Sequence, residues 1–263
     1  MIRIGTSGYD YIDWKEVFYP ADLKREQFLE YYSSIFSTVE LNFSYYRMPS
    51  KEQLKSIIER SGKKIDFSIK AHSSLTHRIV ESAWKDSAKE YIDAIYPLMD
   101  EGVLAAVLLQ FPYSFHYTPD NRRYLNNLIE QMKAAPLVVE FRNSEWLNKR
   151  VFDALREREV AFCSVDAPRL KNLPLPVDIT TSSMAYVRFH GRNEKTWWGS
   201  DAAARFDYKY SEEELKPWID RIITMLRGIE KIRIYFNNHR RGQAVEDAIA
   251  LKHLLEKEGL TEE

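Results

Sequence analysis

The sequence predicts an α/β fold in which eight parallel strands close into one (β/α)8 barrel. Three observations support this prediction: the chain has eight short apolar runs, each run ends at a residue with ionisable or strongly hydrogen-bonding groups, and helix-like segments separate most of the runs. At 263 residues the chain is close to the roughly 250 residues typical of such a barrel. No Pro-, Gly- or Ser-rich linker divides it, so we expect a single domain over residues 1–263.

The predicted strands are rich in Val, Ile, Leu, Phe and Tyr, and most are continuously apolar, as expected of strands that helices cover. They are expected near residues 2–7, 38–43, 65–70, 104–110, 137–142, 161–166, 185–190 and 232–237. The carboxyl ends of parallel strands in a barrel lie on one rim, where enzymes of this fold keep their active sites. The polar residues that end the runs should therefore meet around a single mouth.

Start and stop signals predict the helices between these strands. Capping boxes that begin at Ser50 and Ser211 predict helices to about Arg60 and Arg227, each followed by a glycine. Thr118-Pro119 begins a segment at 119–134, Asn148 caps 149–158, and apolar spacing predicts helices at 23–35, 85–99 and 242–257. Three prolines leave no room for a helix at 167–184, so that crossover should be irregular. Long loops are expected at 9–21, 71–83 and 191–210, on the functional face.

Charge and cysteine content restrict the class of protein. The net charge is −1, from 38 basic and 39 acidic side chains, so the basic excess usual in proteins that wrap duplex nucleic acid is absent. Nucleic acid stays open as a partner but is not favoured. The one cysteine, Cys163, cannot form an intrachain disulfide, and a protein without disulfides suits the reducing cytoplasm. We expect Cys163 to lie in the core. The longest apolar run, 103–109, is too short to span a bilayer, and no secretion signal opens the chain, so we expect no membrane association.

Strand-end acids and a histidine provide the candidate catalytic residues. Glu40 and Glu140 end strands two and five, and two carboxyl groups in unlike surroundings can serve as an acid and a base. His190 is the alternative proton carrier, and Asp166 is a third acid at the rim. A structural role for each stays open, because strand-end Arg–Glu pairs also stabilise barrels that have no chemistry.

The remaining strand-end residues are suited to a small anionic, hydroxylated ligand. Lysine and arginine bind phosphate or carboxylate, and side-chain amides bind hydroxyl groups. The predicted ligand-binding residues are Asn42, Lys70, His77, Gln110, Arg142, Arg188, Asn237 and Asn238. Backbone N–H groups of Gly5-Thr6-Ser7-Gly8 offer a further anion nest, and Trp197-Trp198 is the aromatic pair least typical of a core.

The sequence lacks the common cofactor motifs, namely G-x-G-x-x-G, the Walker loop, H-E-x-x-H and C-x-x-C. A divalent metal remains an alternative, because Glu40, Glu140, Asp166, His77, His190 and His239 have suitable ligand types. Lys70, Arg142 and Arg188 would compete for the same carboxylates. We therefore predict no cofactor.

The ordered motifs resemble those of the YecE-like proteins, a bacterial and archaeal family known as domain of unknown function 72. The resemblance covers nearly the whole chain and rests on Gly5-Thr6-Ser7-Gly8, Val39-Glu40-Leu41-Asn42, Lys70 with Thr76-His77, Leu109-Gln110-Phe111-Pro112, Glu140-Phe141-Arg142, Asp166 with Pro168, Tyr186 to Arg192 and Tyr235 to His239. It implies a TIM barrel and no established activity. Departures at Tyr45, Tyr113, Asn143 and Asp247 leave the strand-end polar residues intact.

Three functions follow as competing hypotheses. The first is an enzyme that uses acid/base chemistry on a sugar phosphate or sugar acid. The second is a metal-dependent phosphodiesterase that acts on nucleic acid, which rests on analogy between folds alone. The third is a non-catalytic protein that binds a metabolite or a partner. The sequence does not indicate an oligomeric state.

Overall fold

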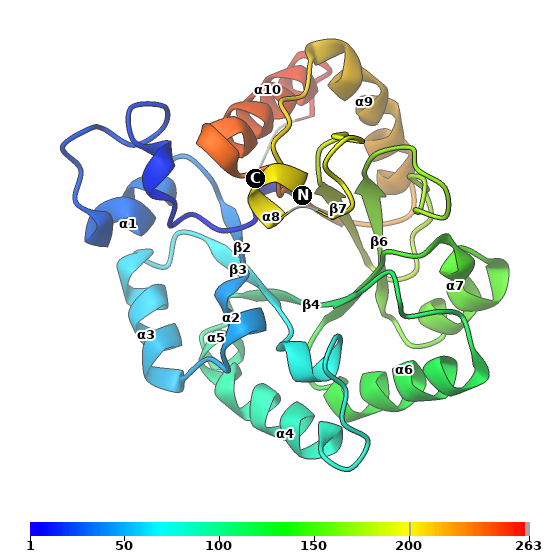
Figure 1. Cartoon of the computed structure of the whole chain (residues 1–263). Helices are drawn as coiled ribbons and strands as arrows, with labels where there is room; N and C mark the ends of the chain where they lie inside the picture. The colour runs from blue at the N-terminus through cyan, green and yellow to red at the C-terminus, as the bar shows by residue number, and fades with distance from the viewer. Residues whose placement is uncertain (200, 261–263) are drawn as a thin grey trace.

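The computed structural model describes residues 1–199 and 201–260, with the side chains of residues 202 and 203 left aside. It contains one sheet of eight parallel strands in the order β1-β8-β7-β6-β5-β4-β3-β2, surrounded by helices (Figure 1). The strands are β1 Ile2–Thr6, β2 Thr38–Leu41, β3 Asp66–Lys70, β4 Leu104–Phe111, β5 Leu137–Phe141, β6 Ala161–Asp166, β7 Met184–Phe189 and β8 Lys231–Phe236. The predicted barrel is confirmed, with strand ends that agree with the prediction to within two residues. Ser200 and residues 261–263 of the predicted domain lie outside the described residues.

The sheet closes where β1 meets β2. The N–H of Gly8 donates to the carbonyl of Glu40 at 2.8 Å, and the N–H of Ser7 donates to the carbonyl of Phe236 on the other side at 2.9 Å. Gly5 permits this approach, because a Cβ atom at that position would lie 2.2 Å from the carbonyl oxygen of Thr38. Residue 5 must therefore be glycine for the two strands to come this close.

Four of the helices begin at the predicted capping residues. Side-chain oxygens of Ser50, Thr118, Asn148 and Ser211 each accept a hydrogen bond from the first turn of the helix that follows. The α-helices are α1 Phe28–Tyr32, α2 Phe43–Tyr46, α3 Lys51–Arg60, α4 Trp84–Ala94, α5 Tyr96–Asp100, α6 Pro119–Met132, α7 Lys149–Arg156, α8 Ala202–Arg205, α9 Glu212–Leu226 and α10 Gln243–Lys257. The 3-10 turns are η1 Ile12–Trp14, η2 Arg25–Gln27, η3 Ser73–Leu75, η4 Ser144–Trp146 and η5 Arg240–Gly242.

Two predicted helices were too long. The segment at 23–35 forms only η2 and α1, and the segment at 85–99 is divided into α4 and α5. Pro97 lies in the first turn of α5, because a proline has no N–H to continue the hydrogen bonds of α4. The irregular crossover at 167–184 is confirmed, since its described residues contain no helix. Nowhere in the described chain does a helix have the length and apolar character needed to cross a membrane.

Side chains along the strands alternate between two cores. One set meets inside the barrel, where Leu108, Cys163, Tyr186 and Tyr235 pack together. The other set, which includes Val107, Val187 and Phe236, packs with residues of the surrounding helices. This two-residue period decides which strand-end residues point into the mouth.

Polar side chains occupy the barrel interior below the mouth. At the amino-terminal end of the strands Asp66 pairs with Arg3 at 2.8 Å and also with Arg233. One layer higher, the hydroxyl of Tyr235 is hydrogen-bonded to Thr38 and Ser68, at 2.5 and 2.9 Å. The interior is therefore a packed stack that supports the residues above it.

Candidate functional site

A pocket lies at the carboxyl ends of the strands, and we call it the strand-end pocket. Its volume is about 550 Å³, within the range of small-molecule sites. Lining residues are Tyr11, Asn42, Tyr45, Tyr46, Lys70, His77, Gln110, Pro112, Tyr113, Arg142, Leu173, Arg188, Trp197, Trp198, Arg205, Phe206, Asn237 and His239. The structure thus brings together seven of the eight predicted ligand-binding residues; the eighth is Asn238.

The lining of the strand-end pocket is cationic. It contains the basic side chains Lys70, Arg142, Arg188 and Arg205, and no carboxylate is among its described residues. The predicted acids Glu40 and Glu140 are completely buried and do not line the pocket. The two glutamates influence the pocket through the basic side chains that they bind.

Arg188 joins the two glutamates. It is 1% exposed, and its guanidinium donates to Glu40 Oε1 and to Glu140 Oε2, each at 2.6 Å. Glu40 also accepts hydrogen bonds of 2.7 Å from the hydroxyls of Ser7 and Tyr186. The guanidinium lies between the carboxylates, so these two acids cannot flank a bound sugar as a glycosidase pair would.

Glu140 is held in its carboxylate form at neutral pH. Burial alone would raise its pKa, but the guanidinium groups of Arg188 and Arg142, together with His190, hold the pKa of Glu140 well below its ordinary range. Arg142 Nε donates to Glu140 Oε1 at 2.5 Å. Because Glu140 stays ionised at neutral pH, its role is to fix two arginines rather than to deliver a proton.

His190 is neutral, and its contacts define the tautomer. Its Nδ1 faces two donors, Asn237 Nδ2 at 3.1 Å and Arg142 Nη2 at 3.5 Å, so we assign Nδ1 as the acceptor and place the proton on Nε2. The Nε2–H then donates to Glu140 at 3.1 Å. Burial and the charge of Arg142 lower the pKa of His190 to about 3. The ring is wholly buried and holds Arg142 and Glu140 in position.

Lys70 is the one lysine of the pocket lining. Its Nζ donates to Gln110 Oε1 at 2.8 Å and lies 4.3 Å from the centre of the Tyr45 ring. Burial, together with the nearby charges of Arg188 and Arg142, lowers the pKa of Lys70 to about 7. Lys70 can therefore exchange a proton at neutral pH.

Three further predicted residues face the strand-end pocket. His77 packs edge-on against Tyr45 at 4.8 Å, and burial, with Lys70 and Arg142 nearby, lowers the pKa of His77 to about 4. Asn42 Oδ1 is buried without a hydrogen-bond partner among the described residues. This oxygen can accept a hydrogen bond from a ligand hydroxyl. Asn237 also lines the pocket, and its side chain is fixed by a hydrogen bond to His190.

Asp166 and Asn238 point away from the pocket. The Asp166 carboxylate accepts four hydrogen bonds of 2.7 to 2.8 Å, from Arg192 Nε and Nη2, the Tyr210 hydroxyl and the Trp218 indole. Asn238 donates to Asp247 at 2.6 Å and to the Tyr208 carbonyl at 2.7 Å. Burial raises the pKa of Asp247 to about 7. Asp166 and Asn238 each come one position after a residue that points into the barrel, so their own side chains point outward. Both connect the barrel to its outer loops and helices.

The predicted anion nest at Gly5-Thr6-Ser7-Gly8 is wrong. The N–H groups of Thr6, Ser7 and Gly8 donate to Tyr32, Phe236 and Glu40 respectively. These hydrogen bonds hold the barrel closed, so the three donors are not available to a ligand. Gly8 adopts a φ of +90° and allows Tyr11, whose hydroxyl donates to the Ser7 carbonyl at 2.8 Å, to pack over the turn.

Long loops supply pocket residues that the strand-end pattern did not identify. Arg205 and Phe206 follow strand β7 in the loop that contains α8, and Leu173 comes from the irregular crossover. Trp197 is buried and lies 5.6 Å from the Arg142 guanidinium. Trp198 is 51% exposed and Tyr46 is 76% exposed, so flat aromatic surfaces stand at the rim. Only the length and aromatic content of the loops signalled these residues in the sequence.

The described residues contain no group of three or more His, Cys, Asp or Glu side chains arranged to hold a metal ion. The acids that a metal would need are bound to arginines, as the strand-end contacts show. Two of the predicted metal ligands, Glu40 and Glu140, are thus already engaged by guanidinium groups.

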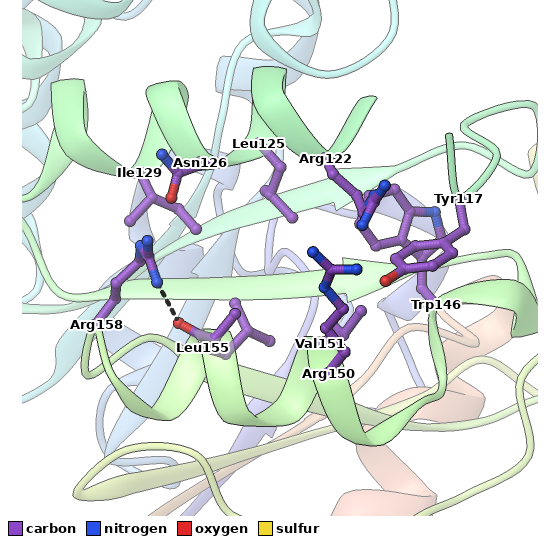
Figure 2. A pocket seen from close by; sticks show the side chains of 11 residues that line it. Tyr117, Arg122, Leu125, Asn126, Ile129, Trp146, Arg150, Val151, Leu155 and Arg158 are labelled. Atoms are coloured by element: carbon purple, nitrogen blue, oxygen red, sulfur yellow. Dashed lines mark hydrogen bonds between the residues drawn. The ribbon is translucent and has the colours of Figure 1, made fainter. Parts of the chain in front are cut away.

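A second hollow lies outside the barrel between α6 and α7, and Figure 2 shows side chains of both helices facing it. It is smaller, at about 220 Å³, and Arg122, Arg150 and Arg158 border an apolar floor. None of the predicted site residues lines it. We call it the outer hollow and use it below for a control substitution.

Comparisons with known proteins agree with this architecture. A family model described as "Protein of unknown function DUF72" matches residues 3–263. The UPF0759 protein YunF of Bacillus subtilis is 29% identical, over 98% of this chain and 96% of the relative. A crystal structure of a DUF72 family protein from Thermotoga maritima is 38% identical with a TM-score of 0.91, covering 97% of this chain and 99% of the other. A DUF72 family structure from Enterococcus faecalis is 24% identical with a TM-score of 0.86, covering 97% and 96%.

Proposed function

Because the chain belongs to the DUF72 family, whose description states no function, we propose its function from the site alone: it is an enzyme that acts on a small anionic, hydroxylated molecule by acid/base chemistry. Sugar phosphates and sugar acids are the substrate class that fits this proposal. The supporting observation is that four basic side chains and no described carboxylate line the strand-end pocket.

The arginines of the pocket are suited to hold the anion. Arg142 and Arg188 are anchored from behind by buried glutamates, so their positions are fixed before a ligand arrives. Fixed guanidinium groups bind phosphate or carboxylate with little cost in side-chain entropy. Arg205 approaches the same space from the loop after β7.

The remaining lining supplies contacts for hydroxyl groups and for a ring. Asn42 offers an unpartnered amide oxygen, and Trp198 and Tyr46 offer exposed aromatic faces at the mouth. Such a combination of deep cations and outer aromatic rings matches a phosphorylated or acidic sugar.

The acid/base step falls to groups that line the pocket. Glu40, Glu140 and His190 are buried beneath the lining and are used in holding arginines and amides. Lys70, with a pKa of about 7, is the lining residue whose proton is exchangeable at neutral pH. This assignment moves the leading catalytic role from the glutamates to Lys70.

Calorimetric titration with inorganic phosphate and a panel of sugar phosphates tests the anion site. Arg142→Met should weaken binding about tenfold or more, because a hydrogen bond between charged groups contributes roughly 1.5–3 kcal/mol. Arg122→Met at the outer hollow is the control and should leave binding unchanged. Equal losses in the two variants would contradict the proposal.

Time-resolved proton NMR of the bound compounds separates an enzyme from a binding protein. An enzyme converts at least one compound of the panel, whereas a binding protein holds it without change. Binding without conversion across the panel would favour the non-catalytic alternative.

A further inference from the structure

Among the described residues, Lys70 differs from the strand-end arginines Arg142 and Arg188 in forming no ion pair with an acid. Arg142 and Arg188 each form an ion pair with a buried glutamate, whereas no described carboxylate forms an ion pair with Lys70. The one hydrogen bond that its Nζ makes within the described chain goes to Gln110 Oε1, at 2.8 Å. The side chain lines the strand-end pocket, so the rest of the amino group faces the space that a ligand would occupy.

Gln110 fixes the position of this amino group. The Gln110 Nε2 donates to the carbonyl of Phe111 at 2.9 Å, which orients the amide oxygen toward Lys70. Gln110 is only 5% exposed, and the Tyr45 ring contacts the amino group at 4.3 Å. The neutral Gln110 oxygen and the Tyr45 ring hold Lys70 Nζ in place. They stabilise the charged form of the amino group less than a carboxylate partner would.

Burial and the neighbouring arginines favour the free amine of Lys70, against the opposing charges of Glu140 and Glu40. Burial, then the guanidinium of Arg188, lower the pKa of Lys70 to about 7, so a large fraction of the side chain is unprotonated at neutral pH. A desolvated lysine beside another cation is an established way to obtain a nucleophilic amine. A lysine that served only to hold an anion would not need to lose its charge.

We propose that Lys70 is a catalytic nucleophile that forms an imine with the aldehyde or ketone carbon of the substrate. This inference rests on the proposed function, because Arg142 and Arg205 would hold the anionic end of the same molecule. The substrate class is thereby narrowed to phosphorylated or acidic hydroxy-carbonyl compounds.

The chemical step balances with water and one proton. The lone pair of Nζ forms a bond to the carbonyl carbon while the C=O π electrons move to oxygen. That oxygen takes one proton from Nζ and one from solvent and leaves as water, and the C=N bond of a protonated imine forms. Hydrolysis reverses the sequence and restores the amine. The positively charged nitrogen withdraws electrons, so the C–H bond on the carbon next to the former carbonyl becomes the bond that breaks, with its proton passing to solvent and its electron pair moving toward the imine nitrogen.

Borohydride trapping on the full chain tests this inference directly. The protein is incubated with glyceraldehyde 3-phosphate, treated with sodium borohydride, digested, and mapped by peptide mass. We expect the main adduct at Lys70, labelled at least about tenfold faster at neutral pH than Lys51, because an ordinary lysine amine is almost fully protonated at that pH. Lys51 pairs with Asp93 at 2.7 Å on the outer surface and serves as an internal control in the same digest.

The pH profile and one variant complete the test. Labelling of Lys70 should rise through about pH 7 and then level off, while exposed lysines continue to gain reactivity toward about pH 10. Lys70→Arg keeps a positive charge, should remain folded by circular dichroism, and should lose the adduct. The mapping on the unaltered chain needs no variant, so a folding defect in Lys70→Arg cannot obscure the result.

The outcomes separate this inference from the proposed function. Label spread over exposed lysines with none at Lys70 overturns the inference. Phosphate binding that depends on Arg142, together with no adduct at Lys70, also overturns it and leaves the proposed anion site standing. Equal labelling of Lys70 by glyceraldehyde and by its phosphate supports the nucleophile and contradicts the anion site.

Discussion

Arg188 and Glu140 are joined by a hydrogen bond of 2.6 Å between Nη1 and Oε2, although they lie 48 residues apart in the chain. Both side chains are buried. The pair connects β7 with β5 at the base of the strand-end pocket, so the position of Arg188 in the pocket lining depends on it.

Glu140→Gln should destabilise the protein strongly. The substitution keeps the size of the side chain but removes the charge that faces Arg188 and Arg142, and breaking a buried ion pair costs about 3–5 kcal/mol. Urea denaturation measures the loss. Glu212→Gln, which removes an exposed partner of Lys216, is the control and should leave the midpoint nearly unchanged. A similar midpoint for all three proteins would contradict the assigned role.

Acid should weaken the protein through the same carboxylate. The pKa of Glu140 lies well below its ordinary range in the folded state, compared with about 4.3 in an unfolded chain. The unfolded state therefore binds more protons, so the stabilisation is complete above about pH 4.3 and falls as the pH drops further. Thermal unfolding between neutral pH and about pH 3 should show a steeper decline for the natural chain than for Glu140→Gln. If the melting temperatures of the two proteins fell in parallel as the pH dropped, Glu140 would not be the source of the acid sensitivity.

Trp198→Ala should affect ligands that contain a ring more than inorganic phosphate. The indole is half exposed at the pocket rim and lies 5.0 Å from the Tyr113 ring. Loss of one stacking surface should weaken binding of a cyclic sugar phosphate about two- to tenfold. Binding of phosphate should not change, and Trp198→Phe should restore most of the affinity. If the substitution weakened binding of both ligands equally, the sugar ring would not stack on Trp198.

Asp166→Asn should reduce stability without changing the strand-end pocket. The carboxylate accepts hydrogen bonds from Arg192, Tyr210 and Trp218 on the outer side of β6. Loss of its charge should cost about 1–3 kcal/mol, measured by urea denaturation. Phosphate affinity of the folded protein should equal that of the natural chain, and a clear loss of affinity would return Asp166 to the site.

Gly5→Ala should weaken the closure of the barrel. The added methyl would lie 2.2 Å from the Thr38 carbonyl oxygen, and overpacking of this kind typically costs about 1–3 kcal/mol. Gly228→Ala is the control, because a methyl there meets nothing within 4 Å. The comparison uses thermal unfolding, and an equal melting temperature in both variants would show that β1 and β2 separate easily.

The strand-end residues were predictable where the two faces of a strand differ in polarity. In β7, the polar side chains of Tyr186 and Arg188 alternate with the apolar Val187 and Phe189. The sequence therefore predicts which side of β7 faces the barrel interior. In β6 the only polar residue before Asp166 is Ser164, a small side chain that marks neither face clearly, so the sequence alone does not indicate that Asp166 points outward. The helix capping residues were also predictable, because a cap depends on one side chain and the turn that follows it.

The rest of the site depends on tertiary structure. Arg205, Phe206 and Leu173 reach the pocket through loops without a hydrophobic period, so their paths could not be derived from spacing. The lowered pKa of Lys70 depends first on its burial in the folded barrel and then on Arg188 and Arg142 from distant strands. The sequence placed all three cations on the rim but could not show which of them lacks an acid.

The filled barrel axis has a kinetic consequence. Asp66 with its two arginines, and Tyr235 with its two hydroxyl partners, obstruct the passage toward the amino-terminal end of the strands. Whatever enters the mouth must leave by the same opening, so an incoming molecule waits until the previous occupant has departed. A departing molecule would then compete with an incoming one for the same opening.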